Sequence, residues 1–141
     1  MRALIGLAAA ALSLSGCETA FVGRAPAGRF ELVEVNGRAL PQVRRSEERC
    51  SVTVTGGHLE LDALARRFQM RIRESSSCSA AASVVLSVSG SYLRRDGRVT
   101  LEAERGAAAG QSWTATESGN SIALSHEGTR LRFRQAERPR R

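Results

Sequence analysis

The segment at residues 113–134, WTATESGNSIALSHEGTRLRFR, alternates apolar and polar side chains around two turn pairs. Gly119-Asn120 and Glu127-Gly128 are the turn pairs, and in the runs beside them apolar residues recur at every second position. A period of two places successive side chains on opposite faces of a β-strand, and short Gly-containing pairs join antiparallel strands. The segment therefore predicts three consecutive antiparallel strands.

The same alternation runs back through the chain to residue 29, and no stretch of useful length after residue 17 has the period of a helix. Asn36-Gly37, Gly56-Gly57 and Asp96-Gly97 are further turn pairs, and we expect Gly56-Gly57 to form a two-residue hairpin. Residues 36–49 read as a long charged connection and residues 74–83 as a soft loop. The predicted strands lie at residues 29–35, 50–55, 58–62, 67–73, 83–92, 98–104, 111–117, 121–126 and 129–134.

An all-β chain with so many short strands predicts a meander that closes on itself. An open sheet of this width leaves one apolar face uncovered and two edges unpaired. Closure into an antiparallel barrel of about eight strands removes both problems, and a two-sheet β-sandwich is the alternative. The side chains expected inside are Phe30, Leu32, Val52, Val54, Leu59, Leu61, Phe68, Met70, Ile72, Leu86, Val88, Val99, Leu101, Trp113, Ile122, Leu124, Leu131 and Phe133.

The N-terminal segment has the three-part layout of a secretory signal peptide. Arg2 supplies the positive charge, an uncharged stretch of twelve residues follows, and Ser15 and Gly16 are small. That stretch is shorter than the roughly 20 residues that a membrane-spanning helix needs. The segment LSGC, at residues 14–17, resembles the lipobox of bacterial lipoproteins, which implies removal of residues 1–16 and acylation of Cys17.

Residues 17–27 are mostly small and include one proline, and they predict a flexible lipidated tether. Several acyl chains hold a protein on a membrane durably, whereas one chain does not. In the lipoproteins that share the lipobox, aspartate after the cysteine favours the inner membrane. Glu18 stands there, so we expect a cell-envelope protein on the periplasmic face of the outer membrane.

The stretch GRFELVEVNGRALP, at residues 28–41, resembles the first strand of small lipocalin-like bacterial lipoproteins. Residues 113–134 resemble the closing hairpins of the same family. The resemblance implies a lipocalin-like barrel over residues 28–134, followed by a basic disordered tail at residues 135–141. SGSY, at residues 89–92, is loosely similar to the serine-glycine loop of a periplasmic lysozyme-inhibitor family, which implies that function as a weaker alternative.

Cys50 and Cys78 form an even pair once Cys17 is assigned to lipid. An exported chain reaches an oxidising compartment, where pairing is the default, so we expect a Cys50–Cys78 disulfide. A metal site has little support, because there is no CxxC motif and only His58 and His126 could assist. We expect neither a metal nor another cofactor.

The positive charge is concentrated at the C-terminal end. Residues 17–129 hold 14 arginines and 13 acidic residues, whereas residues 130–141 hold six arginines and one glutamate. An exported chain rarely meets nucleic acid, so anionic envelope lipid or polysaccharide is the candidate partner, and the alternative is a solvated edge that only keeps the barrel soluble. The residues concerned are Arg130, Arg132 and Arg134, which share the face opposite Leu131 and Phe133, and Arg138, Arg140 and Arg141 in the tail.

No catalytic motif can be identified. His58, Glu60 and Asp62 alternate on one strand face, but the leucines between them take the core face and leave these three in solvent. His126 precedes a turn, and the chain has neither a G-x-S-x-G elbow nor a phosphate loop. The sequence predicts a non-catalytic envelope interaction module that binds a protein or an anionic surface. The alternative is a carrier of a small apolar ligand or lipid, and an empty barrel interior would favour it.

Replacement of the predicted lipid attachment residue tests the anchor. Cys17→Ala removes the thiol that would be acylated, so we expect the protein to leave the membrane fraction and to lose labelling by a fatty-acid analogue. Unchanged membrane partition of this variant would contradict lipid attachment at Cys17.

Overall fold

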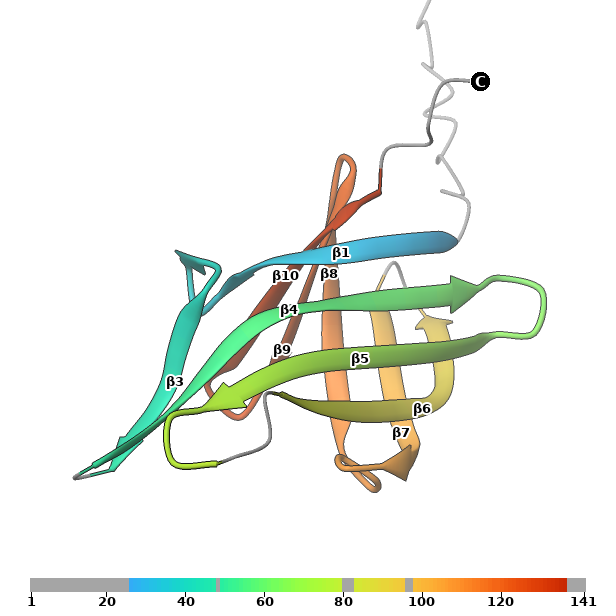
Figure 1. The fold of residues 1–141 in the computed structure, drawn as a ribbon. Helices are drawn as coiled ribbons and strands as arrows, with labels where there is room; N and C mark the ends of the chain where they lie inside the picture. The colour runs from blue at the N-terminus through green and yellow to red at the C-terminus, as the bar shows by residue number, and fades with distance from the viewer. Residues whose placement is uncertain (1–25, 48, 80–82, 96–97, 137–141) are drawn as a thin grey trace, which may run out of the picture.

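The computed structural model describes residues 26–47, 49–79, 83–95 and 98–136, which fold into an antiparallel β-barrel (Figure 1). None of the described residues belongs to a helix that is long and apolar enough to cross a membrane. The strands are β1 (Gly28–Val35), β2 (Arg38–Ala39), β3 (Gln42–Glu47), β4 (Cys50–Asp62), β5 (Arg67–Ser76), β6 (Val84–Arg95), β7 (Arg98–Gly106), β8 (Ser112–Ser118), β9 (Ser121–His126) and β10 (Thr129–Gln135).

Eight of these strands form the barrel. Their order is β1-β10-β9-β8-β7-β6-β5-β4, and β1 pairs with β4 to close the ring. The closing pairs run from Gly28 opposite Leu61 to Glu31 opposite His58. The two remaining strands extend the sheet at its ends, β2 beside β1 and β3 beside β4. The predicted closed barrel of about eight strands is confirmed, and the two-sheet sandwich is not formed.

Most of the predicted core is buried. The exceptions are Val52 and Leu86, which are half-buried. Val52 lies on the part of β4 that pairs with β3, outside the closed ring, and Leu86 lines an open pocket. Val35 is buried although simple alternation from Phe30 and Leu32 predicts an outward position, because the β1–β10 register shifts between Leu32 and Glu34.

The expected hairpin at Gly56-Gly57 is wrong. β4 continues through both glycines for 13 residues, and its register with β5 shifts between Val54 and Gly56. A Cβ at Gly57 would lie 2.5 Å from the Arg71 carbonyl oxygen, so glycine is needed here for the close approach of β5. The glycine pair therefore marks an irregularity within one long strand, not a turn between two.

The long charged connection at residues 36–49 is also corrected, because it contains β2 and β3. These edge strands have no alternating apolar face and are held by backbone pairing to β1 and β4. Hydrophobic periodicity identifies strands that bury a face, so it passes over strands of this kind. The predicted turns Asn36-Gly37, Gly119-Asn120 and Glu127-Gly128 are confirmed.

The segment SGSY lies inside β6, with Gly90 and Tyr92 buried and the two serines half-buried. A Cβ at Gly90 would lie 1.8 Å from the Glu102 carbonyl oxygen and 2.9 Å from the Phe68 ring. The segment is therefore part of the barrel wall, at a point where the β6–β7 register shifts between Ser89 and Gly90, rather than a projecting loop. Residues 1–25, which include the predicted signal peptide, Cys17 and most of the predicted tether, lie outside the described residues, as do Asp96-Gly97 and residues 137–141.

Replacement of Gly90 tests this packing. Gly90→Ala places a methyl group against the β7 backbone, so we expect a loss of about 2 kcal/mol in the free energy of unfolding, measured by urea denaturation with the disulfide intact. Gly56→Ala is the control, because its Cβ would meet only an Arg73 guanidinium nitrogen at 3.7 Å. Equal stability of the two variants would contradict the close contact at Gly90.

Candidate functional site

A pocket of about 290 Å³ opens at the end of the barrel where β1 ends. Figure 1 shows this end of β1 near β3, opposite the end at which β1 begins. Strands on several sides of the ring contribute to its wall, and the β7–β8 turn contributes Ala107, Ala108 and Gln111. The apolar side chains that line it are Val35, Val54, Met70, Ile72, Leu86, Val88, Trp113 and Leu131. The predominantly apolar lining is typical of small-molecule sites.

The other end of the barrel is filled by side chains. Phe30, Phe68 and Tyr92 are buried there, together with Phe133, which has no exposed surface. The Tyr92 hydroxyl donates to the Pro26 carbonyl oxygen at 3.3 Å, and burial raises the pKa of this phenol. The pocket is therefore a cup that is open at one end of the barrel and closed at the other.

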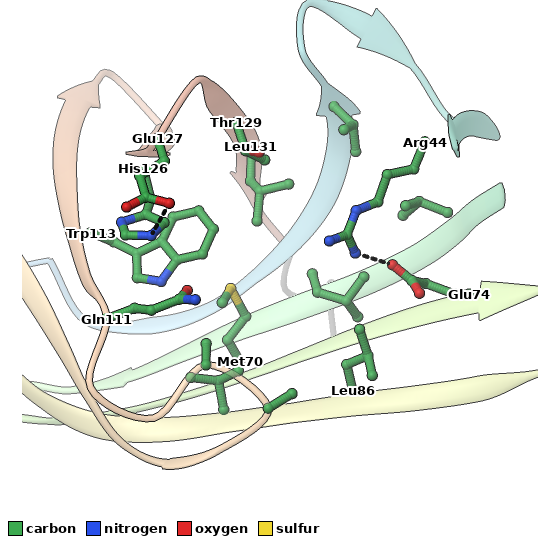
Figure 2. Close-up of a pocket in the computed structure, with 16 residues that line it drawn as sticks. Arg44, Met70, Glu74, Leu86, Gln111, Trp113, His126, Glu127, Thr129 and Leu131 are labelled. Atoms are coloured by element: carbon green, nitrogen blue, oxygen red, sulfur yellow. Dashed lines mark hydrogen bonds and ion pairs between the residues drawn. The ribbon is translucent and has the colours of Figure 1, made fainter. Parts of the chain in front are cut away.

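An ion pair lies on one side of the mouth (Figure 2). The Arg44 guanidinium of β3 donates to the Glu74 carboxylate of β5, whose side chain is only 13% exposed. Arg44 occupies the position where the β3–β4 register shifts, between Val43 and Arg45. A bulge redirects a side chain that regular pairing would send elsewhere, and here the redirected guanidinium neutralises a nearly buried carboxylate.

An aromatic pair lies on the other side of the mouth. The rings of Trp113 and His126 have centroids 5.2 Å apart and planes tilted by 39°. His126 Nδ1 lies 2.8 Å from the Ser112 carbonyl oxygen. A carbonyl can only accept, so Nδ1 carries a proton and the imidazole is fixed against β8. His126 Nε2 faces the Glu127 carboxylate at 3.6 Å, at the exposed rim.

The indole Nε1 of Trp113 is buried and has no hydrogen-bond partner among the described residues. Buried tryptophan N–H groups normally find an acceptor. A buried donor that lacks one costs about 1 to 3 kcal/mol relative to a solvated group. In Figure 2 the nitrogen lies on the side of the ring that faces the pocket interior and Met70. Trp113, which lines the pocket, thus carries one buried and unsatisfied neutral donor.

The predicted disulfide between Cys50 and Cys78 is present, with 5.3 Å between the two Cα atoms. It joins the first residue of β4 to the segment just after β5. The neighbouring Ser51 N–H donates to Ser77 Oγ at 2.8 Å, and the Ser77 N–H donates to the Ser51 carbonyl at 3.0 Å. The bridge therefore fixes the outer ends of β4 and β5; β5 carries Glu74, and β4 pairs with β3, which carries Arg44.

The three candidates on the outer face of β4 have structural partners. Asp62 accepts hydrogen bonds from the Leu64 and Ala65 N–H groups, each at 3.0 Å, and so fixes the β4–β5 turn. Glu60 lies 3.4 Å from the Arg29 guanidinium and 3.7 Å from His58 Nε2. Within the described ranges, no group of three His, Cys, Asp or Glu side chains could hold a metal ion.

The C-terminal arginines face outward on β10 as predicted, with Leu131 and Phe133 inside. Arg132 pairs with Glu34 of β1 at 3.1 Å, and Arg134 lies opposite Glu31 in the β1–β10 register. Acidic residues of β1 therefore offset part of the positive face of β10. The tail residues Arg138, Arg140 and Arg141 lie outside the described part of the chain.

The core position of Trp113 is predicted from the sequence, whereas the pocket beside it is not. The available indication was Glu74, which follows Phe68, Met70 and Ile72 at the inward positions of β5. A carboxylate in an inward register requires a partner or an opening to solvent, and the structure provides both. Nothing in the charged sequence around Arg44 indicated that this arginine supplies the partner.

Comparisons of the chain with protein-family models, with curated protein sequences and with solved structures find no match.

Disruption of the ion pair tests the mouth of the pocket. Arg44→Ala leaves the nearly buried Glu74 carboxylate without its cation, so we expect a loss of about 1 kcal/mol in the free energy of unfolding, measured by urea denaturation. The same substitution in a Glu74→Gln background should cost much less. Arg29→Ala is the control, because its partner Glu31 is half exposed and such a surface pair contributes little. An equal cost of Arg44→Ala in both backgrounds would contradict the coupling.

Proposed function

We propose that this protein is a lipid-anchored cell-envelope protein whose barrel binds a small, mostly apolar ligand in the pocket at its open end. The observation that carries the proposal is the apolar cup of about 290 Å³ that remains unfilled between Met70, Leu86 and Trp113. Its size lies near the lower limit of ligand sites, about 300 Å³. The expected ligand is therefore small.

The physical basis of such binding is the transfer of apolar surface from water. Each methylene group that enters the cup contributes about 0.8 kcal/mol. The lining residues Val35, Val54 and Met70 are almost fully buried and are fixed in the barrel wall, so a ligand meets a surface that is already formed. Preorganisation of this kind lowers the entropic cost of binding.

The interaction-module alternative has less support from the geometry. An anionic partner would have to engage a β10 face on which Arg132 is already paired with Glu34. Binding through the tail arginines remains a prediction, because those residues lie beyond the described chain. The strand conformation of residues 89–92 likewise gives no support to the lysozyme-inhibitor alternative.

The envelope location rests on the lipobox resemblance at residues 14–17. The presence of a Cys50–Cys78 disulfide in the fold fits an oxidising compartment. We assign no catalytic step, because His126 is held by a backbone carbonyl and Glu74 by Arg44. The proposed role is the binding of a small ligand, and the protein is attached to the membrane through the acylated Cys17.

A neutral fluorescent probe, N-phenyl-1-naphthylamine, tests the pocket on the mature chain that begins at residue 17 with Cys17→Ser. We expect a rise and blue shift of the probe emission as it leaves water. Ala108→Phe places a phenyl group in the mouth and should weaken binding at least tenfold.

Ala109→Phe is the matched control, because Ala109 lies in the same turn but is exposed and does not line the pocket. Undiminished binding by the Ala108→Phe variant would contradict the pocket as the site.

A further inference from the structure

The indole N–H of Trp113 is a hydrogen-bond donor beside the pocket that needs an acceptor. Trp113 is the only tryptophan in the chain, and its Nε1–H is buried with no acceptor among the described residues. The ring cannot turn away easily, because Leu101 of β7 lies opposite it in the register and His126 packs on its face. His126 is itself held by the Ser112 carbonyl oxygen. The donor is therefore preorganised.

The charges around the mouth select against an anionic ligand. Arg44 is the only arginine of the described residues that lines the pocket, and Glu74 already neutralises it. Glu127 adds a carboxylate at the rim beside His126. A carboxylate ligand would give up its hydration for one uncharged N–H donor and would face these acidic side chains. A neutral acceptor has no such penalty.

We propose that the ligand is an uncharged aliphatic molecule with a carbonyl oxygen, as in a ketone, an ester or an amide, and that this oxygen accepts a hydrogen bond from Trp113 Nε1. This inference rests on the proposed function and specifies its ligand class. The aliphatic part lies against Met70, Ile72 and Leu86, which line the same cup. The carbonyl oxygen would satisfy the one buried side-chain donor that lacks a partner among the described residues.

Access to the donor requires a small side-chain movement, because the Nε1 atom is covered. Met70 and Gln111 both line the pocket and lie on the nitrogen side of the ring in Figure 2. Both side chains are unbranched, and the thioether of methionine adapts readily to new neighbours. Gln111 is exposed, so its amide can move into solvent without losing hydration.

The test compares three seven-carbon-chain ligands on the isotope-labelled mature chain with Cys17→Ser. This form contains all the described residues, and the barrel closes within them through β1 and β4. The ligands are 2-heptanone, 2-methyl-1-heptene, in which a methylene group replaces the carbonyl oxygen, and the anion heptanoate. The single indole N–H resonance reports the hydrogen bond, and the methyl resonances of Ile72 and Leu86 report occupancy of the cup.

We expect 2-heptanone to shift the indole proton downfield and the alkene to move only the methyl resonances. The ketone should bind about three- to tenfold more tightly than the alkene, which is the usual contribution of one neutral hydrogen bond. Trp113→Phe keeps an aromatic ring but removes the donor, so it should bring the ketone affinity down to that of the alkene. If this variant does not fold, the indole shift in the parent protein still decides.

Equal affinities for ketone and alkene with an unmoved indole resonance would overturn the carbonyl proposal and leave apolar binding in the cup intact. Tighter binding of heptanoate than of the ketone would also overturn it, because the ligand would then be anionic. No change in any methyl resonance with all three ligands would overturn both the ligand class and the proposed function.

Discussion

The pairing of β1 with β4 is the constraint on which the rest of the structure depends. These strands lie at the two ends of an otherwise open sheet, and the pairs from Gly28–Leu61 to Glu31–His58 remove both edges from the barrel. Closure creates a single interior for the alternate apolar residues of eight strands. It also uses only the second half of β4, so the first half, from Cys50, continues past the ring and carries β3 with it.

This division of β4 explains how a charged edge strand reaches an apolar pocket. The β4–β5 register shifts between Val54 and Gly56, near the point where β4 leaves the pairing with β1. Beyond that point β3 lies beside β4, and its bulge directs Arg44 toward Glu74. The disulfide fixes the far end of the same extension. Neutralisation of a nearly buried carboxylate thus depends on a strand that lies outside the barrel.

The barrel could be predicted because each strand shows the alternation of apolar and polar residues within its own sequence. Closure then buries the apolar faces that this alternation defines. Leu59, Leu61 and Phe133 lie inside because their neighbours are polar, and a sequence displays this directly. The hairpin prediction at Gly56-Gly57 is wrong because a glycine pair occurs both in a hairpin turn and in a strand whose partner approaches closely, and the sequence alone does not distinguish the two. The pocket was not predictable, because it depends on how far side chains from many strands fill one end of the interior. No pattern within one strand of the sequence indicates how much of the barrel interior remains empty.

The chain enters β1 at the end of the barrel opposite the pocket. β1 runs from Gly28 to Val35, about 23 Å at the rise of an antiparallel strand, and the pocket opens at the Val35 end. A barrel attached to a bilayer through residues before Gly28 would carry its mouth on the side away from that bilayer. Loading would then proceed from the aqueous space or from an opposing surface, not by lateral entry from the anchoring leaflet. Under that arrangement the free concentration of the ligand in that aqueous space, rather than its diffusion within the anchoring leaflet, sets the rate at which the pocket fills.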